Sequence, residues 1–302
     1  MDACSGTGFI KTDLKIPSMI RQVKRKSMII RPSGRSTDFI TPSFGHGCLY
    51  NCSYCYMKRN KVKGLDIANN HREILEQVLT HSRFADANKP NQTHPVYTTY
   101  DISCNEDFAL HAKYHKWKEI FQFFIDQPNL MGSFATKYVN PDLLMFDPQG
   151  KIRIRFSLMP QNQADIHEPN TSKIIDRIKA INAFIDGGYD VHVNFSPVIL
   201  YKNWEEDYKL LFEMLNDYVD YKNQVYAEVI FLTHNEGRHK HNLNDNPEAE
   251  RQLWVPNLQE DKTSQYGGSN VRYERHLKSK YIKKFKELHN SIIPWNKIRY
   301  IF

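Results

Sequence analysis

The stretch Gly47-Cys-Leu-Tyr-Asn-Cys-Ser-Tyr-Cys-Tyr56 places three cysteines, Cys48, Cys52 and Cys55, on one short loop. Their spacing is C-x3-C-x2-C. Cysteine thiolates hold iron–sulfur clusters, and the usual full set for a four-iron cluster is four cysteines. A loop with three cysteines therefore predicts a [4Fe-4S] cluster held at three corners, with one iron open to a small molecule. This favours catalysis at the open iron over plain electron storage.

Zinc binding and buried structural cysteines are the two other interpretations of this run. Structural zinc normally has four protein ligands, and His46 lies too close to Cys48 in the sequence to reach easily across a tetrahedron. Core cysteines would stand in buried strands, whereas Gly45, Gly47 and Asn51 are typical of a tight loop. The spacing favours the iron–sulfur site and leaves zinc as the open alternative.

The size and composition of the chain indicate one large domain, or one domain with appendages. It has 302 residues, of which 13% are aromatic, and a net charge of +7. No run of eighteen apolar residues is long enough to predict a membrane span, and residues 1–11 lack the apolar segment of a secretory signal. With three of the five cysteines on one loop, a disulfide framework is not expected. We therefore expect a reducing, cytoplasmic location.

The positive charge is unevenly distributed along the chain. It gathers in three clusters, within residues 21–35, 238–241 and 272–286. A solvated surface is the plain interpretation of any one cluster. Three clusters with tyrosines among them favour a polyanionic partner such as a nucleic acid.

Apolar patterns typical of strands and helices alternate along most of the chain. Strands are expected over 38–44, 96–103, 132–138, 152–159, 191–200 and 227–234, and helices over 71–83, 115–127, 173–185 and 204–219. This order predicts a parallel sheet in an α/β fold, a partial (β/α)6 barrel of the TIM type. The barrel would occupy residues 38–235, after a short basic N-terminal arm over 1–37. Residues 236–302 would form a C-terminal extension, with an irregular segment over 236–273 and a helix over 273–290.

The chemistry of such barrels gathers at the C-terminal ends of the strands. The cysteine loop follows the first expected strand, and Cys104, Lys137 and Ser157 lie at the ends of the next three. We therefore expect all of them on one face. The Cys104 S–H bond is weaker than a methyl C–H bond, so Cys104 is a candidate hydrogen-atom donor. A buried structural cysteine is its plain alternative.

A cysteine loop after the first strand of a partial barrel resembles the radical S-adenosylmethionine superfamily. Residues from about 39 to 302 resemble its spore photoproduct lyase family, in the stretches 48–56, 101–107, 134–138, 153–157, 167–172, 203–208 and 266–267. The resemblance implies a lyase that repairs a methylene-bridged thymine dimer in ultraviolet-damaged DNA. It implies a [4Fe-4S] cluster and S-adenosylmethionine as cofactors, and an external one-electron reductant. A monomer is expected.

The resemblance also implies roles for individual residues. Cys48, Cys52 and Cys55 would bind the cluster. The cofactor contacts would be Tyr54, Lys137, Ser157 and Glu106, with Lys137 pairing with the cofactor carboxylate. Cys104 would return a hydrogen atom to the thymine radical, and Tyr54 and Tyr56 would relay the resulting thiyl radical.

Substrate contacts are expected in the C-terminal extension, from Tyr266, Gln265 and Arg272. Two positions differ from the family pattern: Gln265 replaces an arginine, and Glu106 replaces a small hydroxyl residue. These differences motivate a second hypothesis, a radical enzyme of the same family that acts on another nucleic acid or nucleotide. A third hypothesis is a non-catalytic nucleic-acid-binding protein that contains a structural metal.

Overall fold

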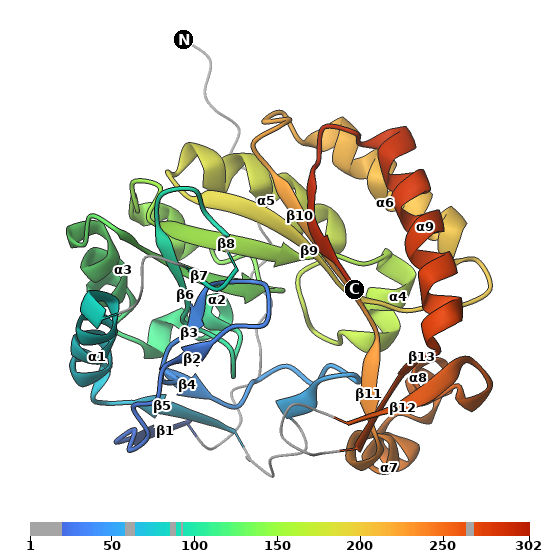
Figure 1. Cartoon of the computed structure of the whole chain (residues 1–302), viewed down its shortest axis with the longest axis horizontal. Helices are drawn as coiled ribbons and strands as arrows, with labels where there is room; N and C mark the ends of the chain where they lie inside the picture. Colours follow the sequence, from blue (N-terminus) through green and yellow to red (C-terminus); the bar gives the residue numbers. More distant parts are fainter. Residues whose placement is uncertain (1–19, 58–63, 85–88, 92, 264–268) are drawn as a thin grey trace.

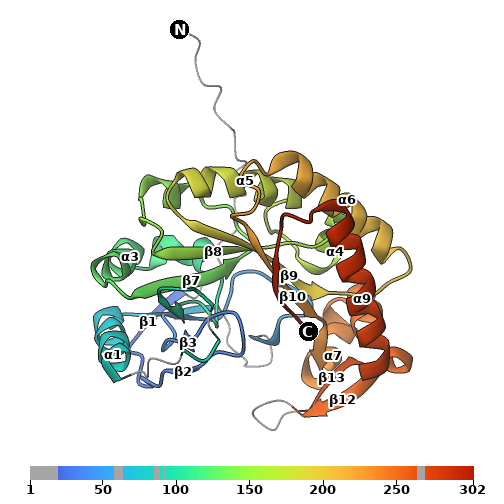
Figure 2. The ribbon, with the colours of Figure 1, turned by 45° about the horizontal axis from the view of Figure 1, so that its top comes forward.

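The structure is a computed structural model that describes residues 20–57, 64–84, 89–91, 93–263 and 269–302. Its central feature is an eight-stranded sheet with the strand order β14-β10-β9-β8-β7-β6-β3-β2. The sheet curls into an open half-barrel (Figure 1), and the larger helices cover its outer face (Figure 2). The predicted α/β partial barrel is therefore confirmed.

The six expected strands lie next to one another in the sheet, and each pairs in parallel with its neighbour. They are β3 (Phe39–Ile40), β6 (Thr98–Asp101), β7 (Leu130–Thr136), β8 (Ile152–Ser157), β9 (Asp190–Val198) and β10 (Tyr226–Phe231). Because all six point the same way, their C-terminal ends meet at one edge of the half-barrel.

Each expected helix is present within a few residues of its predicted bounds. They are α1 (His71–Phe84), α3 (Trp117–Asp126), α5 (Ile174–Asp186), α6 (Trp204–Tyr218) and α9 (Arg275–Ile292). In helix α5 the apolar residues Ile174, Ile178 and Ile181 recur at helical spacing on the buried face, and this spacing is what predicted the helix. It stops before Gly188, whose φ of +84° favours glycine, and a Cβ there would meet the Asp147 carboxylate at 2.0 Å.

Two strands complete the sheet beyond the six that were expected. β14 (Ile298–Ile301) pairs in parallel with β10, and β2 (Arg31–Pro32) pairs antiparallel with β3. β14 is partly held by polar contacts, because Arg299 and Tyr300 bond the buried Glu228 at 2.6 and 2.8 Å. The C-terminal extension therefore returns to the barrel and contributes to its sheet.

The expectation of an irregular segment over 236–273 is wrong. That region contains α7 (Glu236–Asp245), α8 (Pro247–Leu253), η4 (Pro256–Leu258), β12 (Gln259–Thr263) and β13 (Ser269–Tyr273). β12 and β13 form a small antiparallel sheet with β11 (Thr233–Asn235). The helices escaped prediction because α7 buries the polar Arg238 and Asn242 and lacks an apolar stripe.

Short elements lie before and after the cysteine loop in the chain. β4 (Gly45–His46) pairs with β5 (Leu65–Ala68), which pairs in turn with β1 (Ile20–Val23). α2 (Phe108–His111) and η2 (Ala112–Tyr114) follow β6, η3 (Pro141–Met145) follows β7, and α4 (Gln161–His167) follows β8. Across the described part of the chain, every helix is too short or too polar to cross a lipid bilayer.

Candidate active site

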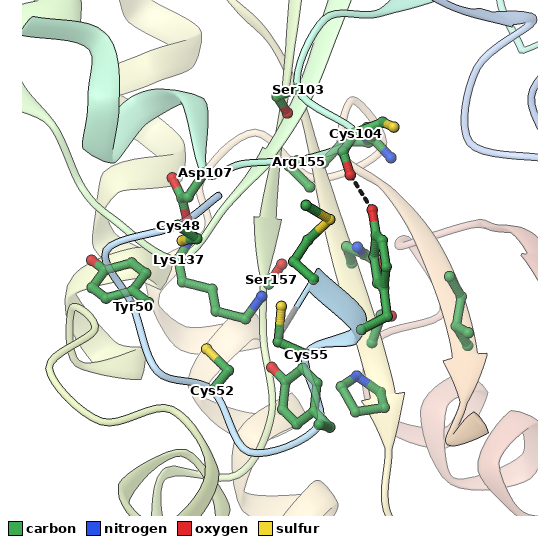
Figure 3. Close-up of a pocket in the computed structure, with 18 of the residues that line it drawn as sticks. Cys48, Tyr50, Cys52, Cys55, Ser103, Cys104, Asp107, Lys137, Arg155 and Ser157 are labelled. Atoms are coloured by element: carbon green, nitrogen blue, oxygen red, sulfur yellow. Dashed lines mark hydrogen bonds between the residues drawn. The ribbon is translucent and has the colours of Figure 1, made fainter. Parts of the chain in front are cut away.

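A cavity of about 390 Å³ opens at the C-terminal ends of the parallel strands. The structure brings the predicted chemical residues together on its walls. They are Cys48, Cys52, Tyr54, Cys55, Tyr56, Cys104, Glu106, Lys137 and Ser157. Figure 3 shows several of these side chains around the cavity. His46, the fourth ligand of the zinc interpretation, is not among the described residues that line it.

The three loop cysteines are free thiols that share one wall of the cavity. Burial raises the pKa of Cys48, and it raises the pKa of Cys52 to about 12. The thiols of Cys48 and Cys52 therefore keep their protons at neutral pH until a metal ion supplies compensating charge. Within the described residues, no three cysteine, histidine or carboxylate side chains converge as a preformed metal site. Three sulfur donors on one loop nevertheless fit a cluster with one open iron.

Ser53 anchors the cysteine loop through all of its polar groups. Its N–H donates to the carbonyl oxygen of His167 at 2.9 Å, and its hydroxyl bonds His167 Nδ1 at 2.7 Å. Its carbonyl oxygen accepts from Arg238 Nε at 2.7 Å and from Asn242 Nδ2 at 2.9 Å. Two helices, α4 and α7, thus hold the backbone between the second and third cysteines.

Glu250 continues this anchor away from the loop. Its carboxylate bonds Asn242, His234 Nε2 at 3.1 Å and His239 Nδ1 at 2.6 Å. We call these four residues the Glu250 network. His234 is 1% exposed, and its Nε2 is bonded to Glu250.

Glu106 lies in a second buried network near the first cysteine. Glu106 Oε2 accepts from His111 Nδ1 at 2.9 Å and from His115 Nε2 at 2.8 Å. His111 Nε2 accepts the Leu49 N–H at 3.3 Å, so the other ring nitrogen, Nδ1, is the one that donates to Glu106. We call Glu106, His111 and His115 the Glu106 network.

The Glu106 carboxylate is ionised and has spare bonding capacity. Burial alone would raise its pKa, but His115 and His111 outweigh burial and lower the pKa to about 2. Among the described residues, nothing bonds its other oxygen, Oε1, which is also buried. Because Glu106 lines the cavity, it can accept a hydrogen bond from a cationic ligand there.

Lys137 supplies a positive charge to the same cavity. Its side chain lines the cavity together with Ser157 and points into it (Figure 3). The ammonium lies 5.7 Å from the centre of the Tyr54 ring. Burial lowers the pKa of Lys137, but Glu168 and Cys52 outweigh burial and leave the pKa raised, so the ammonium is charged. It can therefore pair with a carboxylate.

Tyr54 is held in place by the buried ion pair of Glu168 and Arg177. Its hydroxyl donates to Glu168, and Glu168 pairs with Arg177 at 2.8 Å. Arg177 also donates to the carbonyl oxygen of Ser157 at 2.8 Å. These contacts connect the cysteine loop to the end of β8.

Cys104 stands at the end of β6 with its hydrogen retained. Burial, followed by the charge of Asp101, raises its pKa to about 11. Its S–H donates to Asn105 Oδ1 at 3.3 Å, and its sulfur lies 3.7 Å from Arg31 Nη2. The Tyr56 hydroxyl donates to the carbonyl oxygen of Cys104 (Figure 3). The structure thus joins two of the predicted catalytic residues directly.

The expected substrate contacts lie away from this cavity or outside the described residues. Arg272 is on β13, where its Nε pairs with Glu260 at 2.8 Å, and it is not among the described cavity residues. Tyr266 and Gln265 fall outside the described residues.

Asp107 supports the cavity from α2: it caps that helix and accepts the Lys137 N–H at 2.8 Å, which fixes the end of β7. Sequence reasoning missed the other residues that support the cavity. No pattern in the sequence connects Arg238, Asn242 and Glu250 with the cysteine loop. Arg238, for example, lies 185 positions from Ser53, whose carbonyl oxygen it bonds. The N-terminal capping pattern before Arg238 was the one available hint of a helix there.

The family model for spore photoproduct lyase matches residues 17–302 of this chain. A curated relative, the spore photoproduct lyase of Bacillus subtilis (strain 168), is 29% identical over 196 residues. That alignment covers 64% of this chain and 55% of the relative, so it spans little more than half of the relative's length.

Two solved structures share the fold. One is a spore photoproduct lyase complexed with dinucleoside spore photoproduct, with a TM-score of 0.82 and 19% identity. The other is a variant with bound AdoMet and dinucleoside spore photoproduct, with a TM-score of 0.82 and 18% identity. Each likeness covers 94% of this chain and 82% of the solved chain. Together with the family match over residues 17–302, the fold and the cavity lead to one conclusion: the chain belongs to the spore photoproduct lyase family.

Proposed function

We propose that this protein is a radical S-adenosylmethionine lyase that repairs a methylene-bridged thymine dimer in ultraviolet-damaged DNA. One observation carries the proposal: three loop cysteines, a half-buried lysine and a separate thiol share one cavity. Family membership and the bound molecules of the two solved relatives support the choice of substrate and cofactor.

The cavity offers a matching group for each part of the cofactors. Cys48, Cys52 and Cys55 would hold the [4Fe-4S] cluster. The Lys137 ammonium would pair with the carboxylate of S-adenosylmethionine, and the free oxygen of Glu106 would accept its ammonium group. Tyr54 and Ser157 would contact the rest of the cofactor. When bound, the cluster and S-adenosylmethionine supply a 5′-deoxyadenosyl radical that takes a hydrogen atom from the dimer.

Cys104 then acts on the substrate. As a protonated thiol, it donates a hydrogen atom to the thymine radical that remains after the methylene bridge breaks. The step is downhill because a weaker S–H bond is exchanged for a stronger methyl C–H bond. Tyr56 would take part in returning the thiyl radical, since its hydroxyl already bonds the backbone of Cys104.

A cluster of cations offers a surface for the DNA backbone. Arg35 and Lys278 both lie over the ring of Phe302, at 4.2 and 5.6 Å from its centre. Burial, then the charges of Lys262 and Arg272, lowers the pKa of Lys278 to about 8. Because like charges crowd here, a phosphate would relieve their repulsion. We therefore assign substrate contact to the extension over 236–302, including Arg272, Tyr266 and Gln265.

The decisive experiment uses anaerobically reconstituted protein. We expect about four irons per chain. We also expect reductive cleavage of S-adenosylmethionine, and conversion of the bridged dimer back to two thymines within DNA that was irradiated dry. One zinc per chain, with no cofactor cleavage, would favour the non-catalytic alternative.

The Cys104→Ala variant should still cleave the cofactor but give adducts in place of clean product. Unchanged product purity would remove Cys104 from the mechanism.

A second candidate function is the same radical chemistry on another nucleic acid or nucleotide. The observation that favours it is Glu106, which brings a buried ionised carboxylate to the cavity. Deoxyadenosine formation without repair of the dimer would support this candidate. In either case we propose a monomer in a reducing, cytoplasmic location, served by an external one-electron donor.

A further inference from the structure

Arg238 is a buried cation directly behind the cysteine loop. It lies in the first turn of α7, where its N–H donates to the Asn235 side chain at 2.8 Å. The residue is 2% exposed, and its Nε donates to the carbonyl oxygen of Ser53 at 2.7 Å. Ser53 stands between two of the cysteines, so the guanidinium lies beside the backbone that carries them.

The charge of Arg238 has no direct anionic partner in the part of the chain that the structure describes. None of the ion pairs there includes Arg238, and its buried Nη1 bonds no protein group. Burial lowers its pKa, whereas the charges of Cys55, Asp245, Glu250 and Cys52, in that order, act in the opposite direction. An unpaired buried cation is costly, typically by several kcal/mol. The loop sulfurs, once ionised, would add negative charge to that of Asp245 and Glu250, neither of which forms an ion pair with Arg238 in the described part of the chain.

Hydrogen bonding alone does not explain an arginine at this position. Asn242 already donates to the same Ser53 oxygen at 2.9 Å, without bringing a charge. The two donors therefore differ in one respect that matters for a redox centre. Asn242 fixes the backbone, and Arg238 fixes it and adds a positive charge.

We propose that Arg238 is a positioning residue that holds the cysteine loop and raises the reduction potential of the cluster through its charge. This inference rests on the proposed function, because it requires the cluster. A cation close to an iron–sulfur cluster stabilises the reduced form, which carries one more negative charge. The C-terminal extension thereby acts on radical generation in addition to any contact with substrate.

The test compares three variants of the full-length protein after anaerobic reconstitution. Arg238→Gln removes the charge, Arg238→Lys keeps it, and Asn242→Ala removes the uncharged donor. For each, iron and sulfide content is measured first, and the midpoint potential is then obtained by redox titration of the paramagnetic reduced cluster. Neither readout depends on repair activity.

We expect Arg238→Lys and Asn242→Ala to load the cluster with potentials near that of the wild type. Arg238→Gln should shift the potential to a more negative value. If loss of the charge lowers the equilibrium constant for one-electron reduction of the cluster tenfold, the midpoint potential falls by about 59 mV. Failure of Arg238→Gln to load a cluster, when Arg238→Lys does load one, would equally support a role for the charge.

Three results would overturn the inference. One is a loaded Arg238→Gln variant with an unchanged potential. Another is an equal shift in Asn242→Ala, which would assign the effect to geometry. The third is loss of the cluster from both Arg238 variants while Asn242→Ala retains it, which would assign the effect to the shape of the guanidinium. A wild type without a cluster would instead contradict the proposed function, so the two failures are distinguishable.

Discussion

Two buried carboxylates support the cysteine loop, and they do so in different ways. The Glu106 network reaches the loop at the Leu49 N–H through His111. The Glu250 network reaches it at the Ser53 carbonyl oxygen through Asn242. The first network spans ten consecutive residues, 106–115, whereas the second joins β11, α7 and α8 to a loop far away in the sequence.

The two carboxylates differ in how completely they are bonded. Both oxygens of Glu250 accept hydrogen bonds, the first from His234 and His239 and the second from His234 and Asn242. Among the described residues, Glu106 Oε1 has no donor, and Glu106 lines the cavity. A buried polar group without a partner is costly, so its retention points to a ligand. The Glu250 network also has two unpartnered buried atoms among the described residues, His234 Nδ1 and Asn242 Oδ1, but neither residue lines the cavity. We therefore infer that the Glu250 network is scaffold and that the Glu106 network also serves the cofactor.

The largest loss of folding stability is expected from Glu250→Ala. This change removes an acceptor from the buried His234 and Asn242 and from the half-buried His239, and Asn242 keeps only its bond to Ser53. Removal of one partner from a buried charged network costs about 3–5 kcal/mol of unfolding free energy. Denaturant unfolding of the cluster-free protein measures it. Glu248→Ala, on the exposed side of the same helix, is the control and should cost about 0.5 kcal/mol or less. Equal losses would show that the Glu250 network is not a scaffold.

A smaller loss is expected from Gly45→Ala, which tests the Glu106 network. A Cβ at Gly45 would meet the Glu106 carboxylate at 2.2 Å, and the buried carboxylate has little room to retreat. Overpacking of this kind costs about 1–3 kcal/mol. Gly34→Ala is the matched control, since a Cβ at Gly34 meets nothing within 4 Å. If both variants unfold at the same denaturant concentration as the wild type, Glu106 is not confined as described.

The dependence of stability on pH should separate the two sides of the loop. Burial lowers the pKa of His167 to about 4 from 6.5, so the unfolded chain binds a proton that the folded chain excludes. This contribution is complete above pH 6.5 and is lost as pH falls towards 4, at up to about 1.4 kcal/mol per pH unit. His167→Gln should flatten the curve of unfolding free energy in this window.

Glu106→Gln serves as the comparison for this measurement. The pKa of Glu106 is lowered to about 2 from 4.5, so its contribution is present above pH 4.5 and is lost as pH falls towards 2. The variant should leave the window from 6.5 to 4.5 unchanged. Identical curves for wild type and His167→Gln above pH 4.5 would mean that His167 is not held neutral by burial.

The smallest effect is expected from a substitution in the cation cluster of Arg35 and Lys278, where solvent and salt screen the charges. Lys278→Ala should weaken DNA binding moderately and reduce the slope of log affinity against log salt concentration by about one. Fluorescence anisotropy with a short duplex, measured over a series of salt concentrations, checks this. Lys179→Ala, on the exposed face of α5, is the control and should leave the slope unchanged. Equal slopes for both variants would show that the cations around Phe302, Arg35 and Lys278, do not contact the DNA.

The sequence determined the parts of this protein whose signal is local. Alternating apolar patterns located six parallel strands and the larger helices, because burial of one face imposes a period on neighbouring residues. The spacing of Cys48, Cys52 and Cys55 identified the candidate cluster loop, since ligands on one loop must be close in sequence. The order of strands and helices then placed Cys104 and Lys137 at the same edge.

Tertiary structure alone decided how that loop is held. Arg238 and Glu250 look like surface residues in a charged segment, and their burial follows from contacts with distant parts of the chain. β14 was missed for a related reason, because polar bonds to Glu228 help to hold it in place of a clear apolar pattern. A buried polar network has no sequence period, since its partners are chosen by geometry and charge between segments far apart in the chain.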